Sequence, residues 1–454
     1  MVENNPHDES GSFLPPRPID RIISPVSRFM HVEAMGGVVL LISAIVAIAL
    51  ANSPVSKDFL GFWKTPVGLQ IGTFEFRHPL YHLINDGLMA IFFFVVGLEV
   101  KREIVHGELR GIRQAALPLA AALGGMIVPA GVFLLLQGSD PQARRGWGIP
   151  MATDIAFVVG CMAVLGRRVP HGLRVLLLSL AIADDIGAIL VIAVGYTASL
   201  SMGWLAIGLA GFVLVFLMGR LGIRSFAVYT VVGTFIWFAF HESGVHATIA
   251  GVILGLMTPA NRALGTEGAK RFLDRIASTL KRNDWNDEGK TVGRIRSRYT
   301  VAREMVSPLS FLLHVLHPWV SFVIMPVFAL ANAGVPFSPE DLGKPIAVAI
   351  MAGLFLGKPV GIAAVSYLAV KLRIAQLPSG VSWLQIVGGG VLAGIGFTMA
   401  LFIAGLAVQG QLLSEAKVGV LAASAASAAV GMIILYVAHA RNPQSAATAV
   451  GPGH

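Results

Sequence analysis

The sequence predicts an all-α polytopic membrane protein with about twelve transmembrane helices. Hydrophobic residues make up 55% of the 454-residue chain and only 13% of residues are charged, whereas a soluble globular chain carries about 25% charged residues. Apolar stretches of about 20 residues, the length that crosses a bilayer as a helix, recur along nearly the whole chain. These observations exclude a soluble globular protein.

The expected spans follow from these apolar stretches, which polar or basic segments separate. They lie at about 33–52, 80–100, 115–137, 146–165, 173–196, 203–219, 225–240, 244–258, 305–331, 345–370, 384–408 and 415–439. The segments on the same side as the N-terminus hold 26 of the 34 Lys and Arg residues and those on the other side hold 7, and the ratio is still 15 to 7 when the longest loop is left aside. Because basic loops stay in the cytoplasm, we expect both termini there.

The remaining bulk properties agree with this reading. A net charge of +9 would suggest nucleic-acid binding in a soluble protein, but here retained basic loops explain it and no nucleic-acid partner is expected. Cys161 is the only cysteine, so no intrachain disulfide can form. The polar, Pro-rich first 30 residues contain no apolar core of a signal peptide, so we expect no cleaved leader.

The chain therefore divides into five parts. A cytoplasmic tail (1–32) precedes helices one to eight (33–258), a basic cytoplasmic insertion (259–304) follows, and helices nine to twelve (305–440) lead to a second cytoplasmic tail (441–454). The insertion is either an amphipathic helix on the anionic inner leaflet or a solvated linker.

The first external loop, 53–79, differs from the others in its pattern. Residues LQIGTFEFR alternate apolar and polar side chains and follow Thr65-Pro66 and Gly68, which is typical of a β-hairpin. An exposed hairpin edge can pair with a second copy, so we predict a homodimer through this loop. The alternative is a loop that packs on its own subunit.

Two spans carry residues that interrupt a helix. The fourth contains Pro150 followed by Thr153 and Asp154, and the eleventh contains Gly388–Gly390, Gly394 and Gly396. Proline removes a helical hydrogen-bond donor, and each glycine weakens a helix by about 1 kcal/mol relative to alanine. Unwound backbone at membrane depth occurs only where it is buried in protein or lines water. Close helix packing is the alternative explanation of the glycines.

Two half-helices that cross at their breaks would leave two positive and two negative helix ends facing each other. Asp154 can compensate the positive ends. Lys358 in the tenth span is the one basic residue that we place well inside a span, and it can compensate the negative ends. Ionisable groups within a membrane are usually functional.

Asp184 and Asp185 lie in the otherwise apolar fifth span, where each charge costs about 2.5–3.5 kcal/mol. Neighbouring residues on a helix point about 100° apart, so the two carboxylates cannot face one ion in the same way. We expect Asp185 to face the cavity and Asp184 to reach toward Lys358.

Carboxylates, a threonine hydroxyl and freed carbonyls form a hard oxygen site. Its few ligands suit a monovalent cation better than Ca²⁺, which takes six to eight oxygens. A carboxylate in a partly dry cavity holds a proton more readily and then binds either a proton or a cation. That exclusion is sufficient for an exchanger.

Eight motifs resemble the bacterial sodium/proton antiporters of the NhaA type. They cover about 30–440 in matching order, and they are GLEVKRE (97–103), ATDIAF (152–157), LAIADDIGAI (180–189), SGVHATIAG (243–251), HPWV (317–320), ANAGV (331–335), GKP (357–359) and GIGFTMALFIA (394–404). The resemblance implies twelve helices in inverted-topology repeats, with two broken helices that cross. It also implies a location in the bacterial inner membrane.

The resemblance further implies electrogenic exchange of Na⁺ or Li⁺ for protons, two protons entering for each Na⁺ expelled, with no bound cofactor. It places the ion at Asp185 and Asp184, beside Asp154 and Thr153, with a salt bridge from Asp184 to Lys358 that opens when Na⁺ enters. It implies pH regulation from the cytoplasmic side, and the residues concerned are Glu99, Arg102, Glu103, His246, His314 and His317. The chain departs from the family pattern at Leu313, where an acidic residue is expected, and in the insertion 259–304.

Two other functions fit part of the pattern. An intramembrane aspartyl protease would use Asp154 and Asp185 as a dyad that shares a proton, but the Gly-x-Gly-Asp run is missing. A cation channel could use the acids as a ring, although an unpaired Lys358 would repel cations. The sequence therefore favours a transporter over an enzyme.

Overall fold

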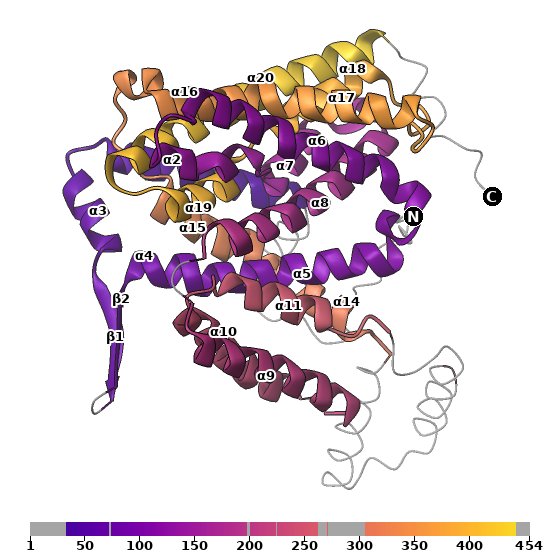
Figure 1. Ribbon diagram of the computed structural model, residues 1–454. Helices are drawn as coiled ribbons and strands as arrows, with labels where there is room; N and C mark the ends of the chain where they lie inside the picture. Colours follow the sequence, from indigo (N-terminus) through magenta and orange to yellow (C-terminus); the bar gives the residue numbers. More distant parts are fainter. Residues whose placement is uncertain are drawn as a thin grey trace, which may run out of the picture.

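The protein folds into a bundle of helices that lie roughly along one direction (Figure 1). The computed structural model describes residues 33–71, 74–197, 200–223, 225–261, 270 and 305–441. The expected tail 1–32, nearly all of the insertion 259–304 and the residues after 441 lie outside the described residues.

The described helices and strands follow the order expected from the apolar stretches, and each expected span contains a helix. In chain order they are α2 (Glu33–Ala51), α3 (Ser56–Trp63), β1 (Pro66–Ile71), β2 (Phe74–Pro79), α4 (Leu80–His82), η1 (Leu83–Leu88), α5 (Met89–His106), η2 (Glu108–Arg110), α6 (Ile112–Gln137), η3 (Ala143–Met151), α7 (Ile155–Leu165), η4 (Gly166–Arg168), α8 (His171–Gly195), α9 (Met202–Arg220), α10 (Phe226–Ser243), α11 (Thr248–Met257), α14 (Pro308–Trp319), η5 (Val320–Ile324), α15 (Met325–Asn332), η6 (Pro339–Gly343), α16 (Pro345–Met351), η7 (Ala352–Gly357), α17 (Lys358–Lys371), α18 (Trp383–Ala393), α19 (Phe397–Ala407) and α20 (Gly410–Arg441).

The prediction of an all-α polytopic membrane protein is confirmed, but the number of helices that qualify as spans is smaller than twelve. Among the described residues, eight helices are long and apolar enough to cross a membrane, or up to ten if α2–α3 and α18–α19 each count as one bent span. Of the other two expected spans, α11 has only 10 residues and α10 ends in His241 and Glu242, which lower its mean hydropathy.

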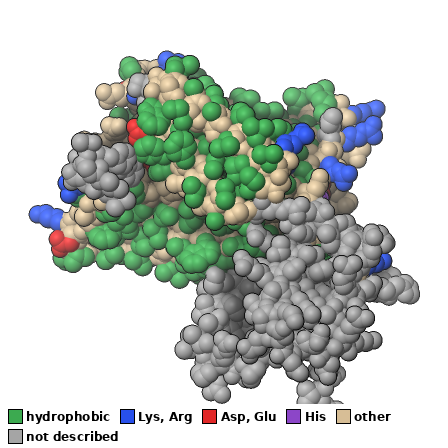
Figure 2. Space-filling model, turned by 90° about the horizontal axis from the view of Figure 1, so that it is seen from below, with side chains coloured by type: hydrophobic (Ala, Val, Ile, Leu, Met, Phe, Trp, Pro, Cys, Tyr) green, Lys and Arg blue, Asp and Glu red, His purple; other side chains and the backbone are tan. Residues whose placement is uncertain are grey.

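Hydrophobic side chains cover much of the outer surface of the bundle. Leu135, Val194 and Leu221 expose 79–87% of their surface, and Figure 2 shows hydrophobic side chains over much of the face that is not grey, with Lys and Arg toward its ends. Patches of this extent are rare on soluble proteins. This surface is suited to lipid, as the composition predicts.

The loop between α2 and α4 contains a β-hairpin. Strand β1 pairs antiparallel with β2, from Pro66 opposite Pro79 to Ile71 opposite Phe74. The hairpin extends away from the helices (Figure 1). We call the end of the bundle that carries it the hairpin end, and the opposite end, where α5 stops at His106, the insertion end. Pairing of the hairpin with a second copy stays a prediction.

The helices that carry the polar residues pack in the centre of the bundle. A single buried core joins residues of α2, α5, α8, α15, α19 and α20, whereas α9 and α10 form a smaller core with α11 at one edge (Figure 1). The tightest crossing lies between α6 and α17. A Cβ atom at Gly124 would lie 2.2 Å from the Gly361 carbonyl oxygen, and one at Gly361 would lie 2.1 Å from the Gly124 oxygen.

We expect Gly361→Ala to lower the thermal stability of the purified protein in detergent. The added methyl group must push α6 from α17, and overpacking of this kind costs about 1–3 kcal/mol. Gly131→Ala is the matched control, because Gly131 also lies in α6 and nothing lies within 4 Å of its added Cβ. Equal melting temperatures for the two variants would contradict the close crossing.

Candidate functional site

The fourth and eleventh expected spans are both interrupted, and the two interruptions touch. Helix η3 ends at Met151, residues 152–154 are non-helical, and α7 starts at Ile155. Helices α18 and α19 are separated by residues 394–396 and meet at an angle of 47°. The Asp154 backbone N–H donates to the Ile395 carbonyl oxygen over 2.7 Å, so backbone groups freed by one break pair with groups freed by the other.

Asp154 lies at the N-termini of two half-helices. Its carboxylate accepts from the backbone N–H of Phe157 in α7 over 3.3 Å and from that of Thr398 in α19 over 3.1 Å. The Thr398 hydroxyl also donates to it. The side chain is 1% exposed. A buried carboxylate in this position stabilises the positive ends of both helices.

Lys358 lies at a C-terminal, negative helix end of the same crossing. Its Nζ is 2.6 Å from Asp184 Oδ2 and donates to the carbonyl oxygen of Met151, the last residue of η3. The side chain is fully buried. The lysine therefore satisfies a carbonyl that the break in the fourth span leaves free, and Asp184 neutralises its charge.

Thr153 joins the two breaks to the fifth span. Its hydroxyl oxygen lies 2.6 Å from Asp184 Oδ2 and 3.0 Å from the Ala393 carbonyl oxygen. A hydroxyl carries one proton, so it donates to only one of these oxygens at a time. Asp184 Oδ2 is thus close to both Lys358 and Thr153.

Some carboxylate oxygens at this crossing have no hydrogen-bond partner. Asp184 Oδ1 is buried and unpartnered. Asp185, next along α8 and 3% exposed, makes no hydrogen bond to another described residue. With all three aspartates and Lys358 ionised, the site carries a net charge of −2. These oxygens and the Thr153 hydroxyl are the groups available to a small cation.

The site is not built like that of a tightly held multivalent metal. Among the described residues, no group of three or more His, Cys, Asp and Glu side chains is arranged to hold a metal ion. Few carboxylates with hydroxyl and carbonyl oxygens suit a monovalent cation that enters and leaves.

The residues expected to regulate the protein do not form one group. Glu99 lies 3.9 Å from His317 of α14, and Glu103 accepts a hydrogen bond of 3.2 Å from Ser179 of α8. Arg102 and His314 are exposed. All five residues lie on α5 or α14 toward the insertion end.

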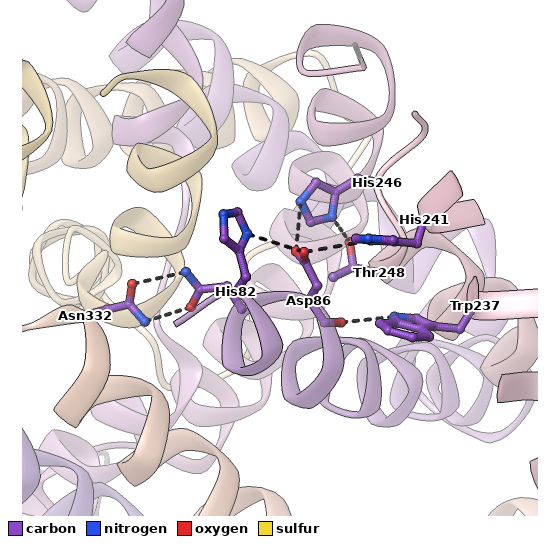
Figure 3. A network of polar contacts seen from close by, with 8 residues as sticks. His82, Asp86, Trp237, His241, His246, Thr248 and Asn332 are labelled. Atoms are coloured by element: carbon purple, nitrogen blue, oxygen red, sulfur yellow. Dashed lines mark hydrogen bonds and ion pairs between the residues drawn. The ribbon is translucent and has the colours of Figure 1, made fainter. Parts of the chain in front are cut away.

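The prediction that groups His246 with those five residues is wrong in placement. His246 lies between α10 and α11 at the hairpin end, with its Nε2 3.9 Å from Asp86 (Figure 3). Asp86 precedes Glu103 by 17 residues of one span, a separation of about 25 Å along a helix. The position of a motif in the chain does not show on which side of the membrane it lies.

Sequence reasoning missed two partners. Thr398 was visible as the polar residue after the glycine break, but its contact with Asp154 joins residues 244 positions apart. Asp86 follows His82 by four residues near the start of the second span. That spacing on a helix was a signal for an interacting pair.

Comparison with known proteins adds to this geometry. The family model described as Na+/H+ antiporter 1 matches residues 27–435. The chain is 52% identical to a Na(+)/H(+) antiporter NhaA of Rhodopirellula baltica, over 94% of this chain and 97% of the relative. It is 50% identical to one of Rhizobium meliloti, over 94% and 98%, and 48% identical to an NhaA 2 of Acidiphilium cryptum, over 96% of each.

We expect Asp184→Asn to lower the free energy of unfolding by about 3–5 kcal/mol, because removing one partner leaves the buried Lys358 without a counter-charge. Thermal unfolding in detergent measures the effect. Asp58→Asn, at an exposed position in α3, is the matched control. The double variant Asp184→Asn/Lys358→Met should recover part of the loss. A single variant as stable as the control would show that the ion pair contributes nothing.

Proposed function

The chain belongs to the Na+/H+ antiporter 1 family, and from that membership we propose that it expels one Na⁺ or Li⁺ for two protons by competition at Asp184 and Asp185. As a member of that family it is a multi-pass membrane protein and a transporter of Na⁺ and H⁺, not an enzyme. The observation that carries the proposed mechanism is the buried, unpartnered Asp184 Oδ1, which lies beside two crossed, broken helices and belongs to the residue before Asp185.

Asp185 is the primary ligand in this proposal. It makes no hydrogen bond to the described residues, so neither a proton nor a cation must displace a protein partner to reach it. A proton on this carboxylate removes the charge that would attract Na⁺, and Na⁺ bound to it removes the basic group that would take the proton. The two occupants therefore exclude each other, which couples their movements.

Asp184 is the second ligand and changes partner during exchange. Its Oδ2 is held by Lys358 and Thr153, while Oδ1 is free. A cation between Asp184 and Asp185 competes with the lysine for the Asp184 carboxylate, so the salt bridge weakens as Na⁺ enters. The released Thr153 hydroxyl can then offer its oxygen to the ion.

Asp154 and Lys358 hold the frame in which this exchange takes place. Asp154 stays bound to the N-termini of α7 and α19, and Lys358 remains close to the C-terminal end of η3. Half-helices fixed in this way can tilt together and expose the acids to one side and then the other. Two protons against one Na⁺ move net charge, so the exchange is electrogenic.

We also propose where the chain lies in the cell and how pH regulates it. Most basic residues lie in loops on the N-terminal side, which supports cytoplasmic termini in a bacterial inner membrane. The pair Glu99–His317 and its neighbours Arg102, Glu103 and His314 then face the cytoplasm, where they can respond to internal pH.

Two other functions receive less support. A protease dyad requires Asp154 and Asp185 to share a proton, but no hydrogen bond joins them among the described residues and Asp154 is bound by Thr398. A cation channel is compatible with a lysine that Asp184 neutralises. It would show Na⁺ flux that is ohmic and independent of proton movement, whereas an antiporter saturates.

We expect Asp185→Asn to abolish Na⁺-driven proton movement, because an amide binds neither a proton at ordinary pH nor a cation with a full charge. The recovery of a ΔpH probe in everted vesicles on addition of Na⁺ or Li⁺ measures the activity. The variant should unfold at the wild-type temperature or above it, since Asp185 has no hydrogen-bond partner to lose among the described residues, and Asp58→Asn should keep full activity. Saturable exchange by the Asp185 variant would remove this residue from the site.

We also expect a homodimer joined through the loop 53–79. The hairpin extends away from the bundle (Figure 1), and the exposed edges of a hairpin pair readily. Deletion of 56–76 should convert the crosslinked dimer into monomer. An unchanged dimer would show that other surfaces join the subunits.

A further inference from the structure

Two buried serines of α20 lie beside the break in the eleventh expected span. Helix α20 packs against both α18 and α19, the half-helices on either side of residues 394–396. Ser424 and Ser427 are three residues apart, so they lie on the same face of α20. They are 6% and 0% exposed. A buried hydroxyl is normally hydrogen-bonded, so the partner of each serine shows what that serine contributes.

Ser424 holds the first residue of α19. The backbone N–H of Phe397 donates to the Ser424 hydroxyl oxygen over 3.1 Å. Phe397 begins α19, and the first four N–H groups of a helix have no partner within that helix. Among the described residues, this is the one hydrogen bond that joins α20 to α18 or α19. It fixes the start of α19 to a single 32-residue helix.

Ser427 lies on the other side of the same break. Its hydroxyl oxygen is 2.8 Å from the position that a Cβ atom on Gly394 would occupy, and Gly394 directly follows α18. This hydroxyl has no hydrogen-bond partner in the described part of the chain. The two serines therefore face opposite sides of the break, but only Ser424 holds a backbone group.

The N-terminus of α19 is shared between Ser424 and Asp154. Asp154 accepts from the next N–H along the chain, that of Thr398, over 3.1 Å, and also from that of Phe157 in α7. Without the serine hydroxyl, the Phe397 N–H would lack its acceptor, and the Asp154 carboxylate is already bound at the same helix end. Loss of Ser424 therefore leaves α19 attached at the break only to the fourth span.

The segment that Ser424 anchors also contacts the exchange site. Ala393 is the last residue of α18, and its carbonyl oxygen lies 3.0 Å from the Thr153 hydroxyl. That same hydroxyl is 2.6 Å from Asp184 Oδ2. Only residues 394–396 separate Ala393 from α19, so a shift at the start of α19 displaces the partner of Thr153.

We propose that Ser424 is a positioning residue of the exchanger. By holding the start of α19 to α20, it keeps the Thr153 hydroxyl and the Asp184 carboxylate in the geometry that cation binding requires. The inference rests on the proposed function for the role of these two groups. A binding site needs its ligands held to within about 0.5 Å, and hydrogen bonds from the surrounding residues provide this restraint. Ser424 does not touch the ion and acts through the backbone of the eleventh span.

The test compares Ser424→Ala with Ser427→Ala in the full-length protein, by recovery of a ΔpH probe in everted vesicles. Ser424→Ala should raise the apparent KM for Na⁺ about threefold or more, because displaced ligands bind more weakly, while the maximal rate per folded protein stays within about twofold. Ser427→Ala removes the same group from the same face of α20 but breaks no hydrogen bond between described residues. Its KM should match that of the wild type.

Hydrogen exchange separates positioning from a general loss of stability. Mass spectrometry of peptides that cover 396–399 should show faster amide exchange in Ser424→Ala than in Ser427→Ala, because the Phe397 N–H has lost its acceptor. Ser424→Thr keeps a hydroxyl acceptor, so it should restore both the slow exchange and the wild-type KM. A variant that is only less stable would lose maximal rate and keep its KM.

Three results would overturn the inference. They are a wild-type KM for Ser424→Ala, equal KM changes in the two alanine variants, and a raised KM in Ser424→Thr although its 396–399 amides exchange slowly. A wild-type protein that moves no protons on addition of Na⁺ or Li⁺ would instead refute the proposed exchange itself.

Discussion

The other buried charges of this structure are needed because two broken helices are in contact. Four helix ends meet in the middle of the bundle, and none of them could remain there without compensation. Asp154 accepts hydrogen bonds from the N-termini of α7 and α19, and Lys358 binds the last carbonyl of η3. Once a lysine is buried for this purpose it needs a counter-charge, which Asp184 provides at 2.6 Å. Asp185, the next residue on α8, makes no hydrogen bond to the other described residues, and the proposed exchange uses this carboxylate to bind the ion.

This arrangement explains why so many charges are present at membrane depth. Each would cost about 2.5–3.5 kcal/mol alone, but the costs of Asp154, Lys358 and Asp184 are offset by helix ends and by one another. In the proposed exchange, the cost of Asp185 is offset when a proton or a cation occupies it, and competition between these two occupants couples their movements.

The sequence predicted the parts of this site that depend on local chemistry. Pro150 and the glycines of the eleventh span showed the two breaks, and the helix-end argument then assigned Asp154 and Lys358 to opposite poles. It did not predict the contact of Thr398 with Asp154 or the ring of histidines at Asp86 (Figure 3). Those contacts join segments that are far apart in the sequence, and the spacing of residues along the chain does not show which sides of two segments face each other. His246 was placed at the wrong end of the bundle for the same reason. Twelve spans were expected, and among the described residues eight to ten helices are long and apolar enough to cross a membrane, because α11 is short and α10 is polar at one end.

The proposed exchange depends on competition between one cation and protons for the same carboxylates, and proton release on cation binding tests this competition most directly. Purified protein in weakly buffered detergent solution should release protons when NaCl or LiCl is added, and should release none with choline chloride. The reciprocity of linked binding requires that the release disappear together with Na⁺ binding when Asp185 is changed to asparagine. Binding of radioactive Na⁺ to the wild-type protein without any proton release across pH 6 to 8 would contradict the account.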